Sequence, residues 1–102
     1  MRAILTRRAR TDLQEALRWI ARDSLQAAND LNDLVEAAGF HIGANPEIGS
    51  HRSMLADLRY RFWPLQRHPY LVIYTNETRP PRIVRVVHSA RDLPVVLADL
   101  RA

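Results

Sequence analysis

The stretch from Leu58 to Asp92 constrains the fold most, because it contains three strand-like runs separated by turn residues. The runs cover residues 58–64, 70–75 and 82–88, and they are rich in the β-branched and aromatic side chains that favour strands. The middle run is continuously apolar from Tyr70 to Tyr74, which is typical of a central strand covered on both faces. The sequence therefore predicts a small sheet with the preceding segments packed on one of its faces.

Alternation along the outer two runs predicts which side chains share a face of this sheet. In the first run, one face carries Leu58, Tyr60 and Phe62 and the other Arg59, Arg61 and Trp63. In the last run, one face carries Ile83, Arg85 and Val87 and the other Arg82, Val84, Val86 and His88.

A short edge strand and two helices are expected before the sheet. Residues 2–6 form a short apolar run, and either Thr6 or Thr11 can cap a helix whose apolar residues then recur at helical spacing. Asp23-Ser24 breaks this pattern and can cap a second helix, which residues 45–49 end. Because few residues join the two helices, we expect an antiparallel hairpin.

Asp92 can cap a last helix over residues 93–100, with Pro94 tolerated in its first turn. The predicted fold class is therefore α+β, with the element order β-α-α-β-β-β-α. An N-terminal strand and a helical hairpin pack on a small, mostly antiparallel sheet.

Length and composition exclude several classes of site. The 102 residues have room for one domain, residues 1–102, and contain no cysteine, which excludes disulfides, zinc–thiolate sites and thiol nucleophiles. No glycine-rich phosphate loop and no metal-ligand spacing is present, so we expect no cofactor and no metal. No apolar run is long enough for a signal peptide or a membrane span, which predicts a cytoplasmic protein without a membrane partner.

The charge is distributed unevenly along the chain. All 15 basic residues are arginine and the formal net charge is +4. Residues 12–36 have two arginines and six acids, a net of −4, whereas residues 52–91 have eight arginines and two acids, a net of +6. We interpret the acids of the helices as a solvated face. The basic sheet region suggests an anionic partner, either nucleic acid or an acidic protein, although genome composition also explains an all-arginine set.

The candidate functional residues belong mainly to the basic sheet region. The candidate partner- or target-binding residues are Arg59, Arg61, Arg82, Arg85, Arg91 and Trp19. Guanidinium groups beside the imidazole of His88 could bind a phosphodiester and support acid–base cleavage, with His88 and Arg91 as catalytic residues. The same arginines could bind an acidic protein, and each alone also fits an ordinary exposed strand residue. Trp19 lies off the apolar stripe of its helix, so it contacts either the next helix or a partner.

Four segments, in order, resemble the ParE branch of the RelE/ParE toxin superfamily, the toxin half of bacterial toxin–antitoxin pairs. They are Thr6-Arg7-Arg8-Ala9 running into Asp12-Leu13, then residues 45–49, 70–74 and 84–93. The resemblance covers nearly the whole chain. It implies a RelE/ParE-like fold and a partner, a ParD-like antitoxin whose C-terminal segment wraps the toxin in a hetero-oligomer.

Two activities occur among such toxins. ParE-like members poison DNA gyrase, trap cleaved DNA and block replication, with at most an indirect DNA contact, whereas RelE-like members cut mRNA on the ribosome. Leu71 stands where the nuclease branch commonly has an arginine, and no tyrosine follows the last strand, while His88 fits the ParE pattern. The resemblance therefore favours a gyrase poison. The alternatives are a ribosome-dependent endoribonuclease and a non-toxic module that only binds an antitoxin.

Overall fold

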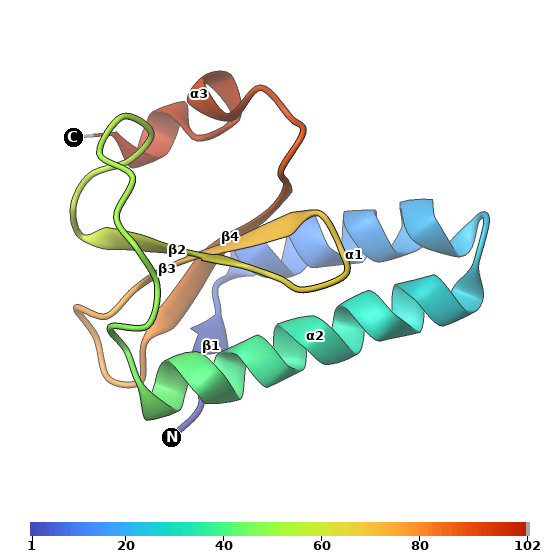
Figure 1. The fold of residues 1–102 in the computed structure, drawn as a ribbon, viewed down its shortest axis with the longest axis horizontal. Helices are drawn as coiled ribbons and strands as arrows, with labels where there is room; N and C mark the ends of the chain where they lie inside the picture. The colour runs from blue at the N-terminus through green and yellow to red at the C-terminus, as the bar shows by residue number, and fades with distance from the viewer. Residues whose placement is uncertain (102) are drawn as a thin grey trace.

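The computed structural model describes residues 1–101, and it places helices on both faces of a four-stranded sheet (Figure 1). The elements are β1 (Ile4–Leu5), α1 (Arg7–Ala21), α2 (Leu25–Ala44), β2 (Tyr60–Pro64), β3 (Tyr70–Thr75), β4 (Arg82–His88), α3 (Leu93–Val96) and the short 3-10 helix η1 (Ala98–Leu100). This order confirms the predicted fold class. None of the helices in the described residues is both long and apolar enough to cross a membrane.

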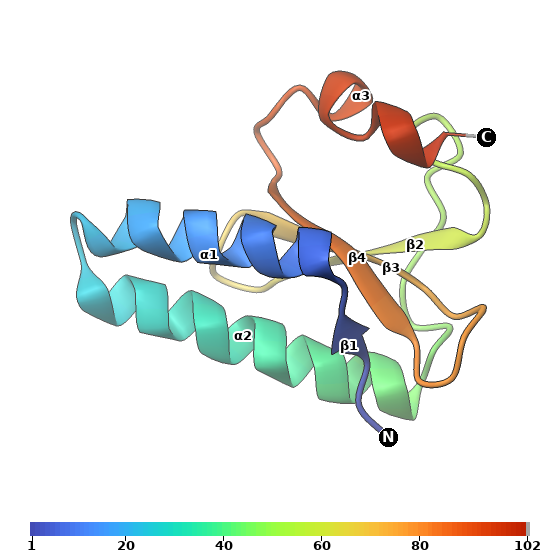
Figure 2. The same ribbon diagram turned by 180° about the vertical axis from the view of Figure 1, so that it is seen from behind.

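The two long helices begin at side-chain caps that the sequence predicted. The Thr6 hydroxyl accepts a hydrogen bond from the Ala9 amide at 3.2 Å, and the Ser24 hydroxyl accepts one from the Ala27 amide at 3.1 Å. The alternative cap, Thr11, lies inside α1 and donates to the Arg7 carbonyl at 3.2 Å. The helices form the expected antiparallel hairpin, which covers one face of the sheet (Figure 2).

The sheet has the strand order β1-β4-β3-β2, with β1 parallel to β4 and the other neighbours antiparallel. All six residues of β3 are buried, because this central strand is covered on both sides. Tyr70, Val72 and Tyr74 face the hairpin, whereas Leu71 and Ile73 face the C-terminal segment that contains α3. The prediction of a doubly covered central strand is confirmed.

A β-bulge in β4 overturns the predicted faces of that strand. Tyr74 pairs with Ile83 while Ile73 pairs with Arg85, so Val84 is an extra residue opposite the junction. As a result Ile83 lies in the hairpin-side core and Val87 in the opposite core, although strict alternation placed them together. In β2 no bulge intervenes, and Phe62 and Trp63 lie on opposite faces as predicted.

The ends of two elements differ from the prediction. β2 begins at Tyr60 rather than Leu58, because residues 57–60 form a turn in which the Asp57 carboxylate accepts the Arg59 amide at 2.9 Å. The last helix ends at Val96 and a separate 3-10 turn follows, so residues 93–100 are not one helix. Asp92 occupies the N-cap position, but its side chain makes no capping hydrogen bond.

Gly43 permits the close approach of the N-terminus to α2. A Cβ atom at Gly43 would overlap the Met1 carbonyl group, which is backbone and cannot rotate away. Next to this contact, the Ala3 amide donates to the Gly39 carbonyl at 2.9 Å. The chain before β1 is therefore fixed against the C-terminal half of α2.

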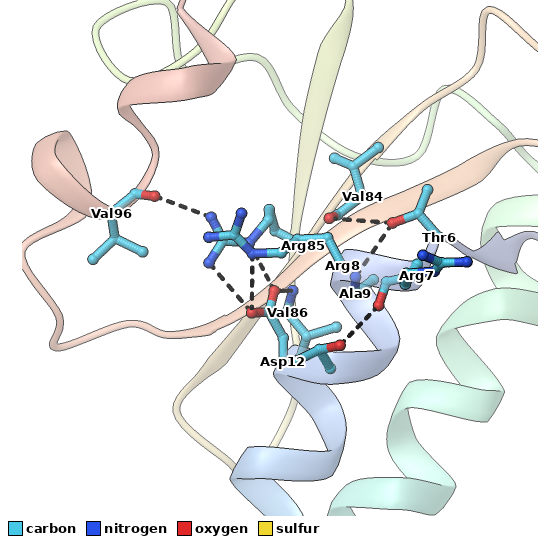
Figure 3. A network of polar contacts seen from close by, with 10 residues as sticks. Thr6, Arg7, Arg8, Ala9, Asp12, Val84, Arg85, Val86 and Val96 are labelled. Carbon is cyan, nitrogen blue, oxygen red and sulfur yellow. Dashed lines mark hydrogen bonds and ion pairs between the residues drawn. The ribbon is translucent and has the colours of Figure 1, made fainter.

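One carboxylate joins three parts of the fold (Figure 3). Because β1 pairs only with the start of β4, the Val86 amide lies on the open edge of β4, and Asp12 on α1 accepts it at 3.0 Å. Asp12 also accepts from Arg85 Nε at 2.7 Å and Arg85 Nη2 at 3.3 Å. The guanidinium then donates from Nη1 to the Val96 carbonyl at 3.0 Å, so α1, β4 and α3 share one network.

Asp12→Ala is expected to lower the free energy of unfolding by about 3–5 kcal/mol, because it leaves the guanidinium of Arg85 buried without a counter-charge. The side chains of Arg85 and Asp12 are only 4% and 11% exposed. Chemical denaturation followed by circular dichroism measures the change. The control is Arg8→Ala, since Arg8 also approaches Asp12 but at 4.0 Å and with a 59% exposed side chain. A loss in the Arg8 variant as large as that in the Asp12 variant would contradict this account.

Candidate functional site

A groove of about 400 Å³ lies between α1 and the C-terminal end of β4. Asp12, Glu15, Ala16 and Trp19 line it from α1, and Tyr70, Val86, Val87, His88, Ala90 and Arg91 line it from the sheet and the turn that follows β4. Three of the predicted functional residues, Trp19, His88 and Arg91, therefore share one groove. It holds both charge signs, with Glu15 on one wall and Arg91 on the other.

The other predicted arginines lie away from this groove. β2 and β4 both run antiparallel to β3, so Arg59, just before β2, and Arg82, at the start of β4, lie at the same end of the sheet. His88 is at the other end of β4, six residue steps from Arg82, or on the order of 20 Å at about 3.3 Å per residue. The structure thus divides the predicted basic cluster between two ends of the sheet.

Arg85 was predicted to bind a partner, but the structure shows that its guanidinium is used internally. The residue is 3% exposed, and its donors are directed to Asp12 and the Val96 carbonyl. Arg85 shares a face with Val87, as the alternation predicts, but the segment that contains α3 covers this face and Asp12 reaches the guanidinium from α1, and the sequence pattern shows neither contact. Arg85 is therefore part of the core and not of a binding surface.

Arg61 and Arg59 differ in how firmly they are held. The Arg61 guanidinium donates from Nη1 to the Gly49 carbonyl at 2.8 Å and to the Glu47 carbonyl at 3.2 Å, which fixes the loop that follows α2. Arg59 is about half exposed and pairs with Asp57 at 3.3 Å. This pairing lowers the pKa of the Asp57 carboxyl group, mainly through the hydrogen bond from the Arg59 backbone amide. Of the two, Arg59 is the one whose side chain is available to a partner.

Trp19 is 67% exposed, so it does not fill the hairpin interior. The Arg22 guanidinium lies 5.1 Å from the centre of its ring, a cation–π distance. Together with Glu15 and Arg18 these residues line a shallow depression that adjoins the groove through Glu15 and Trp19. Of the two sequence interpretations, packing against the next helix is wrong, and a contact with a partner stays a prediction.

His88 is held by the turn that follows β4. Its Nδ1 atom accepts the Ala90 amide at 3.0 Å, and its ring meets the Tyr70 ring edge-on at 5.1 Å between centroids. Burial raises the pKa of the Tyr70 hydroxyl. Because Nδ1 accepts a hydrogen bond, Nε2 is the ring nitrogen that can carry the proton of the neutral imidazole. Of the predicted arginines, Arg91 alone lines the groove with His88.

Sequence reasoning missed the roles of Asp12 and Tyr70. Asp12 was grouped with the solvated acids of the helices, although it is one helical turn from Arg8 and directly beside the apolar Leu13. Tyr70 was interpreted only as a core residue. One signal could have identified the pairing of Asp12 with Arg85. It is an acid close to the apolar stripe of a helix in a chain that also has an arginine in its last strand. Within residues 1–101, no group of three or more potential metal-ligating side chains is close enough to hold an ion.

Tyr70 is expected to ionise above the ordinary tyrosine pKa of about 10, because its hydroxyl is partly removed from water. The unfolded chain then releases this proton first, so the free energy of unfolding falls as the pH rises from about 10 through the pKa of the folded state. Absorbance titration of the phenolate measures the ionisation. Tyr70→Phe should remove part of the phenolate absorbance that appears above the ordinary tyrosine pKa. The rest of this late absorbance should remain, because burial also raises the pKa of Tyr74. A late phase of unchanged size would contradict this.

Comparisons with known proteins agree on one group. The family model described as "ParE toxin of type II toxin-antitoxin system, parDE" matches residues 3–93. The solved structure titled "Chromosomal ParDE TA system from P. aeruginosa" superposes with a TM-score of 0.69 at 17% sequence identity, covering 86% of this chain and 95% of that one. No curated protein sequence matches the chain significantly. At this identity the structural match establishes the fold alone.

Proposed function

The chain belongs to the ParE toxin family of type II toxin–antitoxin systems, and we propose on this basis that it poisons DNA gyrase and is neutralised by a ParD-like antitoxin. Gyrase acts in the bacterial cytoplasm, and there the toxin would trap the enzyme on cleaved DNA and block replication. Binding to gyrase, rather than chemistry on a substrate, is then its activity.

The separation of the arginines from His88 is the observation that carries this proposal over a ribonuclease. A basic nuclease site requires several guanidinium groups around the acid–base residue, within hydrogen-bond reach of one phosphodiester. Arg59 and Arg82 lie at the other end of the sheet from His88. Arg85 is buried against Asp12. The arrangement supports a surface for protein binding better than a catalytic centre.

The antitoxin is the partner that family membership implies. A solved relative of the same fold is itself described as a ParDE system. The surface of this chain offers grooves on both sides of α1, at β1 and at the end of β4, where a wrapping segment could bind. We therefore propose a hetero-oligomer in which the antitoxin covers part of the hairpin.

Purified, antitoxin-free protein should cause gyrase to accumulate cleaved DNA in a supercoiling and cleavage assay, and His88→Ala should retain most of this activity. The reason is that a protein which acts by binding gyrase does not need an acid–base residue, so the imidazole of His88 is not essential. In a parallel assay with the same protein preparation, mRNA bound to translating ribosomes should stay intact. Cut mRNA with normal supercoiling, abolished by His88→Ala in a folded protein, would identify a ribonuclease instead.

Arg59→Glu should weaken binding to gyrase or to the antitoxin more than Arg18→Glu does. Both arginines are exposed, and each substitution changes the net charge by the same amount. Only Arg59 lies near the end of the sheet that also holds Arg82. Surface plasmon resonance with each immobilised partner gives the two affinities. Equal effects of the two substitutions on both partners would argue against a functional sheet surface. Arg61 is unsuited to this test because its substitution also releases the loop at Gly49.

A further inference from the structure

A second groove, of about 330 Å³, opens at the base of the hairpin beside β1. Its floor is apolar and comes from three elements, with Leu5 on β1, Leu13 on α1 and Val35 on α2. Its rim is polar, with Arg10 on the α1 side and Asn32 and Glu36 on the α2 side. None of the residues predicted from the sequence to be functional lines this groove.

The floor of this groove includes the outer edge of the sheet. The amides of Ile4 and Thr6 both donate towards β4, to the carbonyls of Pro81, just before this strand, and of Ile83 within it. Because the backbone alternates along a strand, the amide and carbonyl of Leu5 point away from β4. Among the hydrogen bonds of residues 1–101, none engages the Leu5 amide, and the Leu5 carbonyl accepts only from Arg10 Nη2 at 3.3 Å. The groove is therefore lined by a free donor, the Leu5 amide, and by an acceptor, the Leu5 carbonyl, that Arg10 already occupies.

The charge around this edge is positive. The first ten residues hold four arginines and no acid, and all four arginines are exposed. Two of them, Arg2 and Arg10, line the groove, against the single carboxylate of Glu36. Arg2 lies 5.4 Å from the centre of the Phe40 ring, which holds its guanidinium beside the opening.

We propose that this groove binds an extended, acidic segment of the antitoxin, which adds to the sheet at Leu5. The segment pairs its backbone with the amide and carbonyl of Leu5, and it places an apolar side chain between Leu13 and Val35. Its carboxylates pair with Arg2 and Arg10, so Arg10 leaves the Leu5 carbonyl when the segment enters. This inference rests on the proposed function, because it assigns a binding site to the antitoxin.

The geometry favours an extended segment over a helix. The backbone groups inside a helix are bonded to one another and cannot accept the unpaired amide of Leu5. An added strand has free carbonyl groups that can accept it. The Ala3 amide is already bonded to the Gly39 carbonyl, so backbone pairing is confined to the single residue Leu5. Such a contact is too short to bind alone. The apolar floor and the two guanidinium groups must supply the remaining affinity, which is why the segment needs both an apolar and an acidic side chain.

The matched variants Arg10→Glu and Arg7→Glu test this proposal. Both arginines are exposed residues in the first turn of α1, where a glutamate is favourable to the helix, and each change lowers the net charge by the same amount. Only Arg10 lines the groove. With a full-length ParD-like antitoxin as the partner, calorimetry should show Arg10→Glu raising Kd at least about tenfold, as expected for opposing like charges at an interface. Arg7→Glu should change it less than about threefold, as for a rim charge outside the contact.

Two further measurements make the result independent of charge. Asn32→Trp fills the groove from the exposed face of α2 without altering the charge, and it should also raise Kd. In the wild-type complex, amide exchange at Leu5 should slow on binding, because the amide gains an acceptor. Equal affinities for all three variants and the wild type, or unchanged exchange at Leu5, would overturn the docking site and leave the proposed antitoxin intact. Failure of the wild type to bind would overturn both.

Discussion

The carboxylate of Asp12 is the interaction on which the arrangement of the other elements depends. Where β1 ends, β4 has an open edge, and a side chain from α1 takes the place of the missing strand at the Val86 amide. The same carboxylate balances the only buried arginine in the described residues, and that arginine reaches on to the Val96 carbonyl. One carboxylate therefore ties α1 to β4 and, through the guanidinium of Arg85, to the end of α3.

This network also accounts for the distribution of the arginines. One guanidinium of the sheet is buried to orient α3, and another, that of Arg61, holds the loop after α2 through two carbonyl oxygens. Most of the remaining arginines are exposed, at opposite ends of the sheet or at either end of α1. The arginines of the basic stretch thus have two kinds of role, since some hold the fold together and the others lie on the surface. That division is easier to reconcile with recognition of protein partners than with a reaction centred on one phosphate.

The sequence was sufficient for the fold because the signals involved are local. Thr6 and Ser24 cap their helices, and the unbroken apolar run of β3 reports burial on both faces without reference to the rest of the chain. The candidate site could be predicted only in part, since His88, Arg91 and Trp19 meet in one groove while Arg59 and Arg82 do not. The bulge at Val84 and the pairing of Asp12 with Arg85, 73 positions apart, depend on tertiary contacts that no pattern in one sequence specifies.

The parallel pairing of β1 with β4 has a consequence for how the molecule is made. Ile4 is aligned with Arg82, so β1 has no neighbour in the sheet until β4, 78 positions further along the chain, has been synthesised. Helical hairpins form early because their contacts are local, whereas a pair so distant in sequence must first close a long loop. The edge at Leu5 therefore depends on β4, and a truncated chain that lacks β4 has no sheet neighbour to hold β1 in place for a partner.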